Sequence, residues 1–177
     1  VKKDTINNIS MKEMYKSATE EYEGLKNIQF PKAEDLSEIL FTTGTTGKSK
    51  GIEVTFGCDI AIAENVMDSV EMGKDEVELI TTPINHSLGI RRAYGAIYNG
   101  SSVVLTDGIV FVEDFFKLLD HYKITAITFV PAILEQVLKF AKDRFSGYAK
   151  QFNYIQLGSA PLPETNIDLL TEMFPGV

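Results

Sequence analysis

Glycine, hydroxyl and lysine residues gather between two apolar segments, in the stretch from Leu40 to Gly51. This stretch holds three glycines, four threonines, one serine and two lysines, and it holds no acidic residue. Glycine lets backbone N–H groups turn toward an anion, because it tolerates positive φ and leaves room for a close approach. The threonine hydroxyls add neutral donors, and Lys48 and Lys50 add positive charge. This combination suits a polyphosphate.

One common phosphate-binding pattern, the P-loop G-x-x-x-x-G-K-[ST], fits this stretch only in part. Gly47, Lys48 and Ser49 match its end, but Thr42 stands where its first glycine should be. The sequence therefore disfavours a P-loop NTPase. A flexible connection between two strands, without chemistry, stays open as the alternative.

Two further segments combine turn-forming residues with polar ones. The first, Pro83 to Gly89, contains His86, one of only two histidines in the chain. A histidine at a helix start is often a cap or a satisfied core group, so alone it does not indicate a site. The second, Gly158 to Leu162, offers small residues on which a purine ring can approach the backbone. It also fits a tight turn before a helix that begins near Pro163.

Together the three segments resemble motifs of the adenylate-forming superfamily, which includes acyl-CoA synthetases, 4-coumarate-CoA ligases, luciferases and peptide-synthetase adenylation domains. The first resembles its phosphate loop, roughly T-[ST]-G-[ST]-[ST]-G-x-P-K-G, with Ser49 where proline is usual. The second is similar to a P-x-x-H-x-x-G segment, and the third to a G-[GA]-A-P-L turn. The motifs occur in the family's order, and the resemblance covers residues 36–177.

The resemblance implies a reaction in two steps. A carboxylate attacks the α-phosphorus of Mg-ATP to give an acyl-adenylate and pyrophosphate, and a thiol, usually that of CoA, then displaces AMP. The resemblance also implies roles for single residues. Phosphate would be bound by the hydroxyls of Thr43, Thr45 and Thr46, by the backbone of Gly44 and Gly47, and by the charges of Lys50, which matches the family lysine, and Lys48, which occupies a variable position. His86, the one catalytic candidate, would lie in the acyl site near the CoA passage, and adenine would contact Gly158, Ser159, Ala160 and Pro161.

Other parts of the family pattern are absent from the sequence. It has no Y-G-x-T-E segment, no ribose-binding T-G-D segment and no C-terminal domain with a catalytic lysine. We therefore expect a fragment of a longer enzyme that has no adenylating activity by itself. Two other functions stay open: an adenylation domain that loads a carrier-protein thiol, and a non-catalytic nucleotide-binding domain. Asn85 and His86 stand near where an aspartate would pair with an α-amino group, so an amino-acid substrate is disfavoured.

Strand-like and helix-like segments alternate from Leu36 onward, which predicts an α/β fold with a mainly parallel β-sheet flanked by helices. We expect residues 1–35 to form a connector with a helix around 11–23, and 36–177 to form a nucleotide-binding α/β subdomain. The expected strands are 36–42, 77–82, 102–105, 126–130 and 154–157. Because ligands bind at the carboxyl ends of parallel strands, we expect the loops 44–51, 83–89 and 158–163 to lie together.

The composition of the chain disfavours several classes of partner and site. A formal charge of −8 argues against binding to nucleic acid or to anionic membranes, and no apolar run reaches the ~20 residues of a membrane span. The single cysteine, Cys58, favours a reducing cytoplasm and is expected in the core rather than as a nucleophile. Arg91 and Arg92 are expected to be solvated helix charges. Asp59, Asp107 and Asp120 have no partners at metal-ligand spacing, so no metal site is expected within the chain.

Overall fold

The computed structural model describes residues 29–42, 49–106, 108–109 and 111–177. The chain divides into two units, residues 1–32 and residues 33–177. Of the first unit only residues 29–32 are described, and they form neither helix nor strand. The helix expected over residues 11–23 and the loop residues 43–48 lie outside the described ranges.

The second unit begins with a two-stranded antiparallel hairpin. Strand β1 (Leu36–Thr42) pairs with β2 (Lys50–Thr55), and Thr42 stands opposite Lys50 where the two strands meet the connecting loop. The expectation that residues 36–42 belong to the same parallel sheet as the other strands is therefore wrong. The physical reason is the short connection, because parallel neighbours need a crossover of a dozen or more residues.

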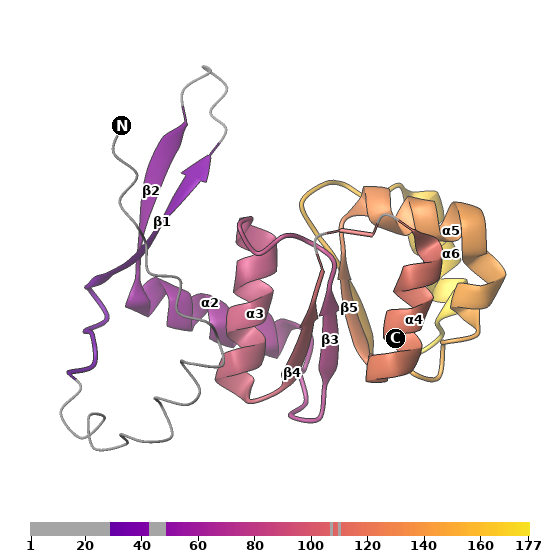
Figure 1. The fold of residues 1–177 in the computed structure, drawn as a ribbon, viewed down its shortest axis with the longest axis horizontal. Helices are drawn as coiled ribbons and strands as arrows, with labels where there is room; N and C mark the ends of the chain where they lie inside the picture. The colour runs from indigo at the N-terminus through magenta and orange to yellow at the C-terminus, as the bar shows by residue number, and fades with distance from the viewer. Residues whose placement is uncertain (1–28, 43–48, 107, 110) are drawn as a thin grey trace, which may run out of the picture. The chain divides into compact units, whose positions relative to one another are not determined.

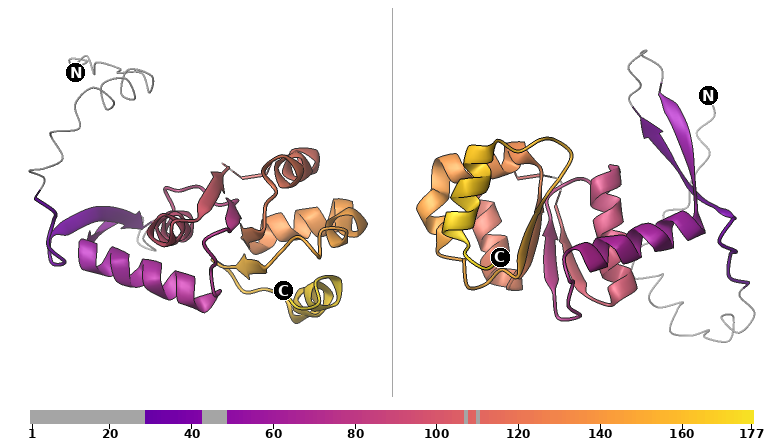
Figure 2. Two further views of the ribbon diagram at one scale, coloured as in Figure 1. Left: turned by 90° about the horizontal axis from the view of Figure 1, so that it is seen from below. Right: turned by 180° about the vertical axis from the view of Figure 1, so that it is seen from behind.

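The main sheet has four parallel strands in the order β4-β3-β5-β6. They are β3 (Val77–Ile80), β4 (Ser102–Leu105), β5 (Ala126–Phe129) and β6 (Tyr154–Leu157). Within the described ranges, five helices accompany them: α2 (Phe56–Ser69), α3 (Ser87–Asn99), α4 (Val112–Tyr122), α5 (Pro131–Ser146) and α6 (Glu164–Met173). Helices α2 and α3 lie on one face of this sheet, and α4, α5 and α6 lie on the other (Figures 1 and 2). The α/β fold with a mainly parallel sheet is confirmed.

Strand β5 shows why both faces are covered. All four of its residues are buried, as is usual for a strand inside a parallel sheet with helices on both sides. Ile127 and Phe129 pack into the larger core with Phe115 of α4 and Phe145 of α5. Ala126 packs on the opposite face, in a smaller cluster with residues from α2 and α3. The chain thus builds two apolar layers on one sheet.

Helical spacing of apolar residues coincides with burial in α4 but not throughout α6. Phe115, Phe116 and Leu119 of α4 lie at helical spacing and are fully buried, whereas Ile167 of α6 is 49% exposed. Cys58 is also exposed, so the expectation that it lies in the core is wrong. The buried residues of α2 are Asp59 and Ala63, which lie four apart on one face, and Cys58 is one position away from that face.

Candidate functional site

Three neighbouring strands of the main sheet end at the same edge. Beyond the last residue of β3, the Thr81 N–H donates to the carbonyl of Thr128 at 3.3 Å. Beyond β6, the Gly158 N–H donates to the carbonyl of Phe129 at 3.2 Å. These bonds extend the parallel pairing up to the loops, so the segments that follow β3, β5 and β6 start side by side.

A cavity of about 470 Å³ opens among these strand ends. Its walls bring His86 of the second motif and Ser159 of the third motif together, although 73 positions separate them in the chain. The described residues that line it are Thr81, Thr82, Pro83, His86, Ser87, Leu88, Gly108, Val130, Ile133 and Ser159. We refer to it as the His86 cavity.

The start of α3 forms one wall of the His86 cavity. His86 is the N-cap residue, its side chain is exposed and makes no capping hydrogen bond, and its N–H donates to the Pro83 carbonyl at 3.0 Å. Gly89 lets the first helical turn lie directly on the end of β3, since a Cβ there would stand 2.6 Å from the Pro83 oxygen and 2.7 Å from the Thr82 oxygen. The glycine of this motif therefore fixes where His86 stands.

The turn after β6 forms the facing wall. Gly158 packs against the side chain of Leu88, whose Cδ2 would be 3.1 Å from a Cβ at this glycine. Ser159 has φ of 71°, a left-handed conformation that costs a non-glycine residue about 1 kcal/mol or more. Ala160 and Pro161 follow and are exposed. Strained backbone of this kind is common where a chain must present itself to a ligand.

A buried ion pair joins α3 to the main sheet. Arg92 donates to both carboxylate oxygens of Glu78 at 2.7 Å and to the Tyr154 hydroxyl at 2.8 Å, and the side chains of Arg92 and Glu78 are 0% and 1% exposed. Thr128 and Tyr154 donate to the same carboxylate at 2.5 and 2.9 Å. Burial and the adjacent Glu78 carboxylate raise the pKa of the Tyr154 phenol above its usual value. The expectation that Arg92 is solvated is wrong.

Arg91, the next residue, is buried as well and links α3 to the hairpin. It donates to Glu38 of β1 at 2.5 Å and to Asp59 of α2, and Tyr94 donates to the other oxygen of Glu38 at 3.3 Å. Burial, followed by the charge of Glu38, raises the pKa of Tyr94. Periodicity could not separate these arginines from surface charges, because their acidic partners lie 14 to 53 positions away.

Of the residues expected to bind phosphate, only Lys50 lies within the described ranges. It is exposed and begins β2, opposite Thr42. Thr43, Gly44, Thr45, Thr46, Gly47 and Lys48 lie outside them. The loop joins two strands of the hairpin and does not follow a strand of the parallel sheet. The expected meeting of three loops at one sheet edge thus holds for the second and third motifs and is not described for the first.

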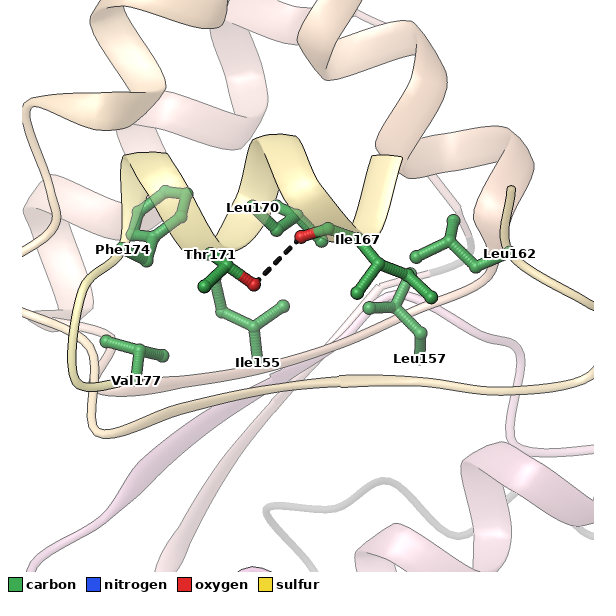
Figure 3. Close-up of a pocket in the computed structure, with 8 residues that line it drawn as sticks. All are labelled: Ile155, Leu157, Leu162, Ile167, Leu170, Thr171, Phe174 and Val177. Atoms are coloured by element: carbon green, nitrogen blue, oxygen red, sulfur yellow. Dashed lines mark hydrogen bonds between the residues drawn. The ribbon is translucent and has the colours of Figure 1, made fainter. Parts of the chain in front are cut away.

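A second hollow, between β6 and α6, contrasts with the His86 cavity. It measures about 130 Å³, and apolar side chains from both elements face one another across it (Figure 3). Its hydroxyl, that of Thr171, donates to the Ile167 carbonyl of the same helix at 2.9 Å. None of the expected site residues lines it. The arrangement suits packing rather than chemistry.

The sequence did not single out several residues of the His86 cavity. Thr81, Thr82 and Val130 come directly after expected strands, and this position is the signal that could have found them. Ile133, one turn into α5, has no such signal. Ile84, two residues before His86, lines another hollow together with Asn85 and Leu105. Among the residues that the structure describes, no cluster of His, Cys, Asp or Glu is arranged for a metal ion, and no helix is long and apolar enough to cross a membrane.

The fold and the cavity define an α/β protein with a ligand-sized hollow at the carboxyl edge of a parallel sheet. The chain belongs to the AMP-binding enzyme family, whose sequence model matches residues 2–177. A 4-coumarate–CoA ligase-like protein of Arabidopsis thaliana is 27% identical over 146 residues, which are 81% of this chain and 26% of that protein. The 2-succinylbenzoate–CoA ligase of Bacillus subtilis is 28% identical over 160 residues, which are 89% of this chain and 31% of that enzyme.

Solved structures show the same fold. The O-succinylbenzoate coenzyme A synthetase of Bacillus subtilis, in complex with ATP and magnesium ion, superimposes with a TM-score of 0.70 at 23% identity over 82% of this chain and 30% of that one. The chain thus spans less than a third of the length of these relatives.

Proposed function

We propose that the chain is part of an AMP-forming carboxylic acid–CoA ligase, in which it supplies the phosphate loop and part of the acyl and adenine pocket. Family membership supports the enzyme class. The observation that carries the site is the meeting of His86 and Ser159 in one cavity, since the two belong to separate motifs and only folding brings them together.

The acyl group of the substrate is assigned to the His86 cavity. Leu88, Val130 and Ile133 give it aliphatic walls, and these suit the apolar body of a small carboxylic acid. His86 is exposed at the start of α3, where its ring can reach a carboxylate or an incoming thiol. We assign His86 the role of orienting the reacting group, because a side chain at a helix N-cap is held by a rigid element.

The nucleotide is assigned to the first and third motifs. The exposed turn from Ser159 to Pro161 has small side chains that leave its backbone open to the flat face of adenine. The hydroxyls of Thr43, Thr45 and Thr46, the backbone of Gly44 and Gly47, and the charges of Lys48 and Lys50 would hold the phosphates. ATP activates the acid by supplying a leaving group. No residue of this chain is assigned as a ligand of Mg²⁺.

The second substrate is assigned as the thiol of CoA. We place the enzyme in the cytoplasm and assign it no affinity for nucleic acid. The names of both curated relatives given above contain CoA ligase, which supports CoA over a carrier-protein thiol. Two alternative functions stay open. One is an adenylation domain that loads a carrier protein, and the other is a domain that binds nucleotide without catalysis.

Acid-dependent exchange between ATP and pyrophosphate tests the proposal in the protein that carries this chain. We expect exchange with at least one small apolar acid and a loss of about tenfold or more in His86→Ala, since the histidine positions a reacting group. The matched control is His121→Ala, because His121 is exposed on α4 and does not line the cavity. The chain by itself is expected to show no exchange.

The outcomes separate the three functions. AMP formation that requires CoA supports the ligase, whereas transfer only to a carrier protein supports the alternative adenylation domain. Nucleotide binding without exchange for any acid would contradict both enzymes. Equal losses in His86→Ala and His121→Ala would contradict the role of His86.

A further inference from the structure

One residue that lines the His86 cavity carries a buried hydroxyl group without a hydrogen-bond partner in the described part of the chain. Thr82 lines the cavity and is 6% exposed, and its Oγ1 is buried without a partner among the residues that the structure describes. The neighbouring Thr81 behaves differently, because its hydroxyl donates to the Thr128 carbonyl at 2.8 Å. A buried hydroxyl that finds no partner lowers stability, so its presence calls for an explanation.

The other described residues that line the cavity do not pair with this hydroxyl. Leu88, Val130 and Ile133 are aliphatic, and the Thr81 hydroxyl already donates to the Thr128 carbonyl. The remaining hydroxyl and imidazole groups that line the cavity, those of His86, Ser87 and Ser159, belong to exposed residues and form no hydrogen bond with Thr82. The Thr82 hydroxyl is therefore an unpaired polar group, buried behind a largely aliphatic wall. A change of its χ1 rotamer would turn this hydroxyl toward a ligand in the cavity, where it could donate or accept.

The lack of charged residues in the described part of the wall limits which groups the Thr82 hydroxyl can bind. No lysine, arginine, aspartate or glutamate is among the described residues that line the cavity. An anionic group placed beside Thr82 would lose its hydration without gaining a cationic partner. A neutral oxygen, such as that of a ketone or an alcohol, meets no such penalty.

We propose that Thr82 is a specificity-determining residue, whose hydroxyl hydrogen-bonds a neutral oxygen of the acyl group. The preferred substrate is then a small acid whose apolar body carries a keto or hydroxyl group. This inference rests on the proposed function, and it adds a substrate class to that site. A site built to pair with a substrate oxygen discriminates against the analogue that lacks it, because its own polar group then stays unpaired.

Matched pairs of acids test the inference. Each pair differs by one keto or hydroxyl oxygen on the same carbon skeleton, and the readout is the ratio of kcat/KM values in ATP–pyrophosphate exchange by the protein that carries this chain. We expect a preference of about tenfold for the oxygenated acid, the usual weight of one neutral hydrogen bond. Thr82→Val, which keeps the shape and removes the hydroxyl, should bring the ratio to about one. Thr82→Ser, which keeps the hydroxyl, should retain the preference.

Stability separates this role from a structural one. Without substrate, Thr82→Val should leave the midpoint of urea unfolding unchanged or raise it, whereas Thr81→Val should lower it, because only Thr81 loses a hydrogen bond. Exchange that occurs with an unaltered ratio in Thr82→Val, or a midpoint that falls in this variant, would overturn the inference alone. Absence of exchange with every acid would overturn the proposed function and this inference with it.

Discussion

Replacing Arg92 with methionine tests how α3 is held against the sheet. The substitution keeps most of the side-chain volume but removes the guanidinium that neutralises Glu78, whose side chain is 1% exposed. Two hydrogen bonds of 2.7 Å to the carboxylate and one of 2.8 Å to Tyr154 are lost. A buried charge left without its partner costs about 3–5 kcal/mol of unfolding free energy, and we expect a loss of this size.

Equilibrium urea unfolding measures this loss. The double variant Glu78→Leu with Arg92→Met removes both charges, and it should recover most of the stability because no buried ion is left alone. Lys117→Met is the control, since Lys117 forms an exposed pair with Asp114 on α4 and should change nothing measurable. A loss below about 1 kcal/mol in Arg92→Met, or no recovery in the double variant, would refute the reasoning.

Three further predictions concern the surroundings of the cavity. Burial and the adjacent Glu78 carboxylate raise the pKa of the Tyr154 phenol above its ordinary value of 10.0. Above about pH 10 the unfolded chain loses this proton while the folded protein keeps it, so the free energy of unfolding should fall there by up to about 1.4 kcal/mol per pH unit. Urea unfolding of Tyr154→Phe should show a shallower alkaline decline than the wild type; an equal slope would contradict this. Gly89→Ala should cost about 1–3 kcal/mol, because its Cβ would stand 2.6 Å from the Pro83 oxygen, whereas Gly73→Ala, with nothing closer than 3.6 Å, should not. Ser159→Gly should raise the melting temperature by relieving the positive φ, and Ser159→Ala should not; equal effects would contradict the strain.

The sequence predicted the elements of the main sheet closely, because each has a local signal. Strand 102–105 and strand 154–157 match the observed bounds, and the expected strands 77–82 and 126–130 differ only at their ends. Such signals are properties of a few adjacent residues, as with a glycine just past a helix end or a proline at a helix start. Gly100, for example, ends α3 with φ of 78°, and Pro131 begins α5.

Long-range pairing had no such signal. The antiparallel partnership of β1 and β2, and the burial of Arg91 and Arg92, depend on residues that are distant along the chain or on the length of a connection. Only part of the candidate site could be predicted, because the rest depends on residues that are distant along the chain. His86 and Ser159 were recognised from their motifs, but the unpaired Thr82 hydroxyl and the aliphatic wall became visible only when strand ends lay side by side.

The position of a bound acyl-adenylate tests the central claim most directly. A crystal structure of the protein that carries this chain, grown with ATP and an acid that supports exchange, should show the acyl carbons within about 4 Å of Leu88, Val130 or Ile133. It should also show the adenine ring against the turn from Gly158 to Pro161. An acyl group in the hollow between β6 and α6, or one far from His86, would contradict the assignment of the site.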